Sequence, residues 1–208
     1  MTIVVVASGP SLTKEDVDYC RGRAEVLCVN DCYRLAPWAE YMYAADWDWW
    51  TSIPLDSGQP NYAMSKRVFL GERFTCDVQA AKVHKLKLVE HSIDPEPGKV
   101  WGGNSGHEAV VLAQLFGARR IVLLGFDMGE TGLGHWFGRH PILRKSLPDG
   151  TWYSENLDRS TEANFSDWRD DMKRLAAVLK GAGIEAFNCT RTTALKCFPR
   201  RTLQEVLT

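Results

Sequence analysis

The stretch from Gly102 to Glu108, Gly-Gly-Asn-Ser-Gly-His-Glu, has the residue types of an anion-binding turn at the start of a helix. Ser105 and Glu108 stand three residues apart, the spacing of a capping box, which predicts that a helix begins here. A glycine-rich turn leaves backbone N–H groups exposed, and the helix dipole favours a negative charge beside them. The stretch therefore predicts a phosphate-binding site formed by Asn104, Ser105 and Gly106. A well-capped core helix without a ligand is the alternative, since short glycine motifs have low specificity.

Two histidines in a segment rich in glycine and aromatic residues, residues 128–163, could supply acid–base chemistry. A histidine is the natural general base near neutral pH, and Asp127, just before the segment, could orient its ring. His135 lies between a glycine and a tryptophan, whereas His140 precedes a proline, which restricts its backbone to extended conformations. We therefore expect His135, rather than His140, to deprotonate an acceptor group. The alternative is that both histidines only pack within the segment.

Metal-dependent chemistry is a further alternative. Asp46, Asp127 and one histidine could hold Mg²⁺ against a diphosphate, because hard cations prefer oxygen ligands. Cys28 and Cys32 could belong to a zinc site, but no histidine or cysteine at matching spacing accompanies them. We therefore assign no metal ligands and keep Mg²⁺ as a candidate cofactor.

Apolar runs that end in polar residues predict the framework that would position these groups. Such runs occupy residues 3–7, 25–30, 40–45 and 120–127 and are typical of buried strands. Polar residues recur at or just after their ends, namely Ser11, Asn30, Asp46 and Asp127. Because ligands of open parallel sheets bind beyond the carboxyl ends of the strands, we expect these side chains at one functional edge.

Helical patterns alternate with the strands. Thr13 with Asp16 predicts one helix start, and residues 109–116 predict a buried helix that ends at Gly117. Asn164 is expected to cap the clearest helix, whose apolar stripe comprises Phe165, Trp168, Met172, Leu175 and Leu179. Weaker patterns predict strands at 67–70, 86–91 and 184–189 and helices at 77–83 and 203–207.

The order of these elements predicts an α/β Rossmann-like fold, a mixed and mostly parallel sheet with helices on both faces. We expect a single nucleotide-binding domain over residues 1–208. Residues 128–163 show no regular pattern and are expected to form a long loop inserted after the Asp127 strand, closing as a lid over the ligand.

Composition narrows the classes of function. The 208 residues carry a formal net charge of −1, which implies no general affinity for nucleic acid or for an anionic membrane. No apolar run is long enough to span a bilayer, and the first residues read as a strand rather than a signal peptide. The six cysteines include no Cys-x-x-Cys pair, so we expect reduced thiols in a cytoplasmic protein. The sequence leaves open whether the protein forms a homo-oligomer.

The chain contains neither a Gly-x-Gly-x-x-Gly nor a Gly-Lys-Ser/Thr motif, which disfavours a dinucleotide site and a P-loop kinase. Four segments together resemble the nucleotide-binding signature of bacterial Rossmann-like sialyltransferases that use CMP-sialic acid: Ile3 to Leu12, Val29-Asn30, Asn104-Ser105-Gly106 and Leu124 to Asp127. The same skeleton is similar to that of the hydroxymethyldihydropterin pyrophosphokinase-like family. The length and the His-Trp-rich loop look most like those of phage-encoded proteins that share this skeleton, which would place this chain in a host cytoplasm.

The resemblance implies roles for individual residues. In the sialyltransferases the first turn and the helix start hold the phosphate and ribose, and the asparagine after the second strand contacts the nucleotide. Nucleotide-binding roles are therefore implied for Gly9, Pro10, Ser11, Asn30, Ser105 and Gly106. The family takes a catalytic histidine and phosphate-binding tyrosines from the loop after the aspartate strand, which here supplies His135, His140 and Tyr153. This chain departs from the family in having no histidine at residues 160–164, shortly before the long helix.

Three functional hypotheses follow. The first is a nucleotide-dependent transferase, a glycosyltransferase with a nucleotide-sugar donor of the CMP-sialic-acid type. The second is pyrophosphokinase-like transfer from ATP with Mg²⁺. The third is a non-catalytic phage protein that binds and sequesters a nucleotide. Each predicts a small-molecule nucleotide ligand, and slow hydrolysis of a nucleotide sugar would separate an enzyme from a sequestering protein.

Overall fold

The computed structural model describes residues 1–45, 49, 53–54, 71–75, 84–88, 96–129, 131, 134–138, 143–146, 152–155 and 161–208. At 53–54, 88, 143–146 and 152–155 the description covers the backbone alone. Within these residues no helix combines the length and the apolar character needed to cross a membrane.

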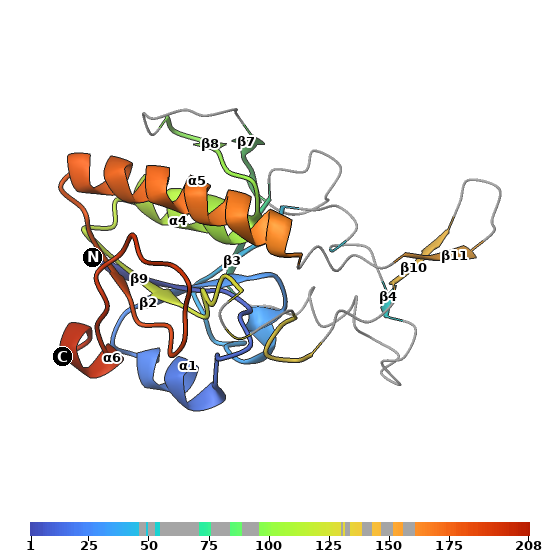
Figure 1. The fold of residues 1–208 in the computed structure, drawn as a ribbon, viewed down its shortest axis with the longest axis horizontal. Coiled ribbons are helices and arrows are strands. Elements are labelled where there is room, and N and C mark those ends of the chain that lie inside the picture. The colour runs from blue at the N-terminus through green and yellow to red at the C-terminus, as the bar shows by residue number, and fades with distance from the viewer. Residues whose placement is uncertain are drawn as a thin grey trace.

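Seven strands form the central sheet in the order β12-β9-β1-β2-β3-β5-β6 (Figure 1). Their bounds are β1 Thr2–Val6, β2 Glu25–Val29, β3 Tyr41–Tyr43, β5 Glu72–Thr75, β6 His84–Lys85, β9 Arg120–Leu124 and β12 Glu185–Asn188. All pairings between these strands are parallel. The predicted α/β fold is confirmed, and this sheet is wholly parallel rather than mixed.

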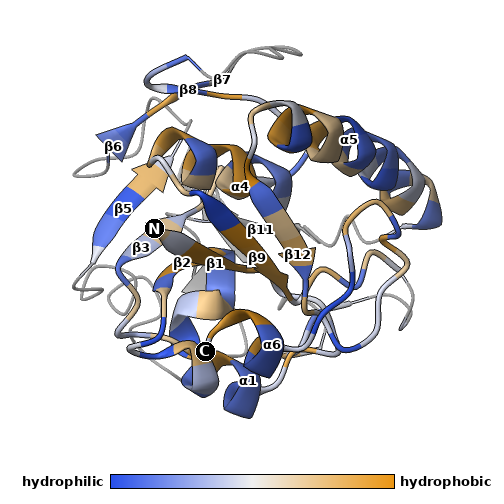
Figure 2. Ribbon diagram, turned by 90° about the vertical axis from the view of Figure 1, so that its left-hand side faces the viewer, coloured by the Kyte–Doolittle hydropathy of each residue, from blue (hydrophilic) through white to orange (hydrophobic). Residues whose placement is uncertain are grey.

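Helices cover both faces of the sheet. α4 (Ser105–Leu115) and α5 (Glu162–Gly181) lie over one face, and α1 (Lys14–Cys20) and α6 (Leu203–Val206) over the other (Figure 1). Figure 2 shows the hydrophobic central strands β1 and β9 between the two helical layers. Successive side chains of a strand point to opposite faces, so each face of the sheet has its own core. Ile3 and Val5 belong to the core beneath α4 and α5, whereas Val4 and Val6 belong to the core beneath α1 and α6.

Two helices begin with a different cap from the one predicted. Asn104, not Ser105, caps α4, and its Oδ1 accepts from the N–H of His107 at 3.0 Å. Thr161, not Asn164, caps α5, and its hydroxyl accepts from the N–H of Asn164 at 3.2 Å. In both cases two cap-type residues stand close together, and the earlier one takes the extended backbone that a cap requires. The cap predicted at Thr13 is confirmed, because its hydroxyl accepts from the N–H of Asp16.

The start of α4 is tied to the end of β3 by buried polar contacts. Glu108 does not complete a capping box; its Oε2 accepts a hydrogen bond of 2.8 Å from the hydroxyl of Tyr43. The hydroxyl of Ser105 accepts from the N–H of Ala45 at 3.3 Å. Glu108 is 3% exposed and Tyr43 is fully buried, so these contacts set the position of α4 at the carboxyl ends of the strands.

Two smaller sheets complete the described structure. β4 (Ile53–Pro54), β10 (Leu143–Ser146) and β11 (Trp152–Glu155) form an antiparallel sheet, and β7 (Lys87–Leu88) pairs with β8 (Lys99–Val100). The prediction that residues 128–163 lack regular structure is therefore wrong at β10 and β11. Four-residue strands with one or two apolar residues are too short to show a clear alternation. The elements predicted at 67–70 and 77–83 lie outside the described residues.

Candidate functional site

The carboxyl ends of β1 and β9 form the topological switch point of the sheet. From β1 the chain passes through α1, on one face, to β2, whereas α4 and α5, which precede and follow β9, lie on the other face. Open α/β sheets bind ligands in the crevice where the strand order reverses, outside the carboxyl ends of the strands. The turn from Ser8 to Ser11 and the residues after Leu124 meet at this point.

The buried polar residues gather at this same edge. Asp31 follows β2, Thr75 ends β5, Asp127 follows β9, and Ser105, His107 and Glu108 belong to the first turn of α4; all are at most 8% exposed. Thr190 and Thr193 follow β12 and are also buried. Among the described residues, one buried polar side chain lies far from this edge, that of Gln114 near the end of α4. Burying polar groups carries a cost, and functional sites are a common reason for retaining them.

Asp127 holds the turn after β1. Its carboxylate accepts 2.9 Å hydrogen bonds from the N–H and the hydroxyl of Ser11, and a 2.7 Å bond from the hydroxyl of Thr131. Gly9 leaves the room for it, since a Cβ at that position would lie 2.0 Å from Asp127 Oδ1 and 2.5 Å from the carbonyl oxygen of Gly125. The two Ser11 donors that a phosphate would use are thus occupied by Asp127. The roles predicted for Gly9 and Ser11 in phosphate binding, and for Asp127 in catalysis, stay predictions.

His135 lies against the end of β1. Its Nδ1 is 2.7 Å from the hydroxyl oxygen of Ser8, and the N–H of the following Trp136 donates to the carbonyl of Ser8 at 2.9 Å. Reciprocal backbone bonds of 2.8 Å between His135 and Gly138 close a small hairpin over residues 134–138. The structure therefore brings His135 to the switch point, but through Ser8, whereas the predicted partner Asp127 binds Ser11 and Thr131.

Two asparagines present buried amide atoms without a hydrogen-bond partner at this edge. Asn30, directly after β2, has φ +49° and a buried Oδ1 that finds no donor within the described part of the chain. Asn104 uses its Oδ1 as the cap of α4, and its Nδ2 is likewise buried with no acceptor in the described residues. A left-handed conformation is uncommon outside glycine, and such residues cluster at functional sites. The amides of Asn30 and Asn104 are the groups best suited to meet a ligand.

Gly106, for which a ligand contact was predicted, packs against other residues of the protein. A Cβ on Gly106 would lie 3.1 Å from Asn104 Oδ1 and 3.3 Å from Phe126 Cε1, so its lack of a side chain lets the start of α4 pack closely against Phe126, which follows β9. The N–H groups of Ser105 and Gly106 belong to the first turn of α4, where no intrahelical carbonyl is available to them. The anion-binding role predicted for Ser105 and Gly106 stays a prediction, and the groups that these residues could offer to an anion are their backbone N–H groups.

Other predicted site residues lie outside what the structure describes. Asp46 and His140 are not among the described residues, and of Tyr153 the backbone in β11 is described. Pro10 lies in the turn at the switch point. Asp46 and Asp48 form an Asp-x-Asp pair a few residues after β3, a signal in the sequence that belongs with the Mg²⁺ alternative.

Metal ligation by the described residues lacks support. They include no group of three or more histidine, cysteine, aspartate or glutamate side chains placed to hold an ion. Cys28 and Cys32 are fully buried thiols, and burial raises the pKa of each well above its ordinary value.

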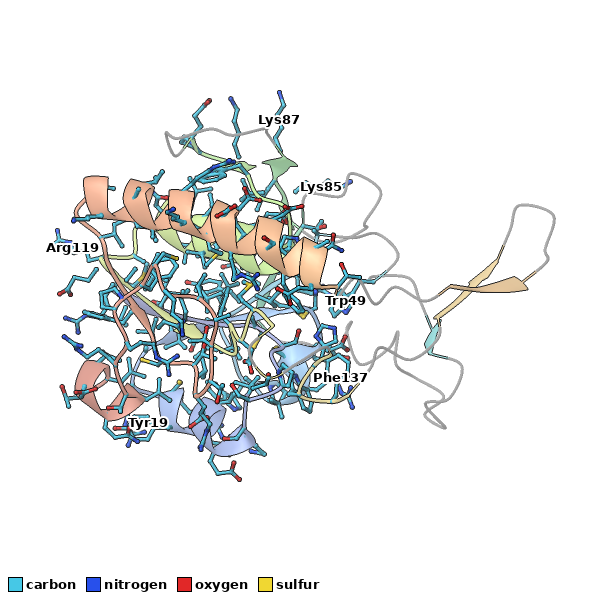
Figure 3. The ribbon with its side chains drawn as sticks, viewed as in Figure 1. Tyr19, Trp49, Lys85, Lys87, Arg119 and Phe137 are labelled. Carbon is cyan, nitrogen blue, oxygen red and sulfur yellow. The ribbon has the colours of Figure 1, made fainter. Side chains whose placement is uncertain are left out.

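Ser8 and Arg34 are the functional candidates that sequence analysis missed. Ser8 lies in the turn after β1, and its contact with His135 joins residues 127 positions apart, for which no local pattern exists. Arg34 ends the 3₁₀ helix η1 (Asn30–Arg34), and its guanidinium lies 5.4 Å from the ring centre of Trp136 and 5.9 Å from that of Phe137. Figure 3 shows Phe137 and Trp49 on the side of the molecule opposite Arg119, which precedes β9.

Comparisons with models of protein families, with curated proteins and with solved structures find no match to this chain. The resemblance to sialyltransferases and to pyrophosphokinase-like proteins therefore stays a hypothesis carried by the turn after β1, the asparagine after β2 and the start of α4.

We expect Asp127→Ala to lower the free energy of unfolding by about 2–4 kcal/mol, because the N–H and hydroxyl of Ser11 lose their acceptor. Urea denaturation followed by tryptophan fluorescence measures this loss. Thr131→Val is the matched control, which removes one hydrogen bond to the same carboxylate and should cost about 1 kcal/mol. Unchanged stability of the Asp127 variant would contradict a role in holding the turn.

Proposed function

We propose that this protein is a nucleotide-dependent transferase whose ligand binds at the carboxyl edge of the sheet, beyond β1, β2 and the start of α4. The observation that carries the proposal is the pair of buried amide atoms, Asn30 Oδ1 and Asn104 Nδ2. One is an acceptor and the other a donor, and a buried polar atom left without a partner costs about 1–3 kcal/mol. A ligand with hydroxyl and phosphate groups would satisfy both.

The charge of a phosphate group has two sources of stabilisation at this edge. The first turn of α4 offers the N–H groups of Ser105 and Gly106 and the positive end of the helix dipole. Arg34 supplies a cation, and no acidic side chain in the described part of the chain forms an ion pair with it. These groups come from α4 and η1, two elements at the carboxyl edge of the sheet.

The reaction we favour is glycosyl transfer from a nucleotide-sugar donor of the CMP-sialic-acid type, with His135 as general base. This choice rests on the resemblance of the turn, of Asn30 and of the start of α4 to the sialyltransferase signature. His135 is partly buried at the switch point, and its ring stacks on Phe137 with centroids 5.0 Å apart and 12° between the planes. A stacked ring held by a hairpin is oriented for proton transfer.

A second candidate is phosphoryl or pyrophosphoryl transfer from a nucleoside triphosphate with Mg²⁺. The Asp-x-Asp pair at Asp46 and Asp48 favours it, since carboxylates that follow β3 are suited to hold a metal-bound polyphosphate. The Ser8–His135 contact favours it too, because a hydroxyl beside a base is suited to attack phosphorus.

Asn30→Gly tests the ligand site directly. Glycine accepts the left-handed backbone of position 30, so the variant removes the amide while leaving the fold unstrained. We expect the affinity for CMP or a nucleoside diphosphate to fall about tenfold or more, which corresponds to about 1.4 kcal/mol for a lost hydrogen bond. Isothermal titration calorimetry measures the affinity, and the melting temperature should stay within a few degrees. Unchanged affinity would place the ligand elsewhere.

His135→Ala tests the base. Turnover of a nucleotide sugar, followed as slow hydrolysis without acceptor, should fall by a factor of about 10² to 10⁴ while nucleotide affinity changes little. His84→Ala is the control, since His84 is exposed on the edge strand β6 and faces Glu72 at 3.6 Å. Tight binding with no turnover in the unaltered protein would instead favour the sequestering hypothesis.

A further inference from the structure

The hydroxyl of Ser8 contacts a histidine at the switch point of the sheet. Ser8 lies two residues after the end of β1, at the switch point, and begins the turn that leads into α1. Its oxygen lies 2.7 Å from Nδ1 of His135, which is the geometry of a hydroxyl that can pass its proton to a neighbouring base. Ser8 and His135 are each partly buried, so they are neither sealed in the core nor fully surrounded by water.

The contact is held by the backbone as well as by the side chains. The hydrogen bond from the N–H of Trp136 to the carbonyl of Ser8 fixes the hairpin against the turn, and Gly138 closes the hairpin on His135. The Ser8 side of the contact is fixed too, because Asp127 binds Ser11 three residues later. A nucleophile and its base are therefore positioned by two elements that are each anchored independently.

A cation lies near the hairpin that carries His135. Arg34 covers the rings of Trp136 and Phe137, the two residues that follow His135 in the hairpin. Among the described residues at this turn, Asp127 is bound to Ser11 and Thr131, and Arg191 pairs with Asp16 at 2.6 Å. Arg34 is thus the cation placed to balance the negative charge that develops when a phosphate is attacked.

We propose that Ser8 is a nucleophile activated by His135, and that it carries a phosphoryl or nucleotidyl group during the reaction. The Ser8 oxygen forms a bond to the phosphorus of the bound nucleotide while the bond from that phosphorus to the leaving oxygen breaks. The Ser8 proton passes to His135 Nδ1 and then to the leaving oxygen. An acceptor hydroxyl next attacks the phosphorus, gives its proton to His135, and Ser8 recovers that proton as it leaves.

This inference rests on the proposed function for its substrate class, a phosphate ester or anhydride, and corresponds to the second candidate reaction. Its test does not depend on nucleotide binding. The full chain is treated with a fluorophosphonate probe, in which a serine hydroxyl activated by a base displaces fluoride from phosphorus. The labelled peptide is identified by mass spectrometry, and the labelling rate is measured for each variant.

We expect the label on Ser8, its loss in Ser8→Ala, and an unchanged rate in Ser166→Ala, whose serine is exposed on α5. His135→Gln should lower the rate at least a hundredfold, because an amide can keep a hydrogen bond to Ser8 but cannot take its proton. Circular dichroism confirms that the variants fold, and Ser8→Ala retains the backbone bond to Trp136.

Two results would overturn the inference: no label on Ser8 in the unaltered protein, or an equal labelling rate in His135→Gln. Calorimetry with CMP and with a nucleoside diphosphate on the same preparation separates this failure from that of the proposed function. A labelled Ser8 without nucleotide binding means that the nucleophile stands and the proposed ligand is wrong. Nucleotide binding with an inert Ser8 means that the inference alone fails.

Discussion

The carboxylate of Asp127 is the contact on which the geometry of the carboxyl edge depends. It joins the turn after β1 to the end of β9, two neighbouring strands whose connecting helices lie on opposite faces of the sheet. The approach is so close that position 9 has no room for a Cβ, which would stand 2.0 Å from the carboxylate oxygen. Glycine at this turn therefore serves the packing of an acid against the backbone, and the acid in turn fixes Ser11.

A fixed turn gives the neighbouring groups their positions. Ser8, two residues after β1, is held from two sides: the N–H of Trp136 donates to its carbonyl, and Nδ1 of His135 lies 2.7 Å from its hydroxyl oxygen. On the next strand, Asn30 takes the left-handed conformation as the chain enters η1. The amino edge of the sheet differs, since its charged residues, such as Arg120 and Glu185, meet in an ion pair whose side chains are 37% and 55% exposed. This contrast between the two edges supports a ligand at the carboxyl edge.

The sequence predicts the fold well because the strands of a buried parallel sheet are continuous apolar runs, as at residues 3–6 and 121–124. Helix starts are predicted to within a few residues, since Asn104 and Ser105 are adjacent cap-type residues and Thr161 and Asn164 stand three apart.

For the candidate site, the sequence predicts the edge of the sheet where the polar residues gather, but not the contacts between them. Asp127 was expected to orient His135 and binds Ser11 instead, a contact between residues 116 positions apart that no local pattern indicates. The pairing of Ser8 with His135 depends on tertiary folding alone.

Hydrogen–deuterium exchange with and without a nucleotide tests the central claim, that the carboxyl edge of the sheet binds the ligand. A saturating nucleoside diphosphate or CMP is added, and exchange is followed by mass spectrometry. The account predicts slower exchange at residues 8–11, 30–34, 104–108 and 134–138, which form the carboxyl edge. Residues 22–24, 117–119 and 181–184, at the amino edge, should be unchanged. Protection confined to the amino edge, or no protection at any of these segments, would contradict the account.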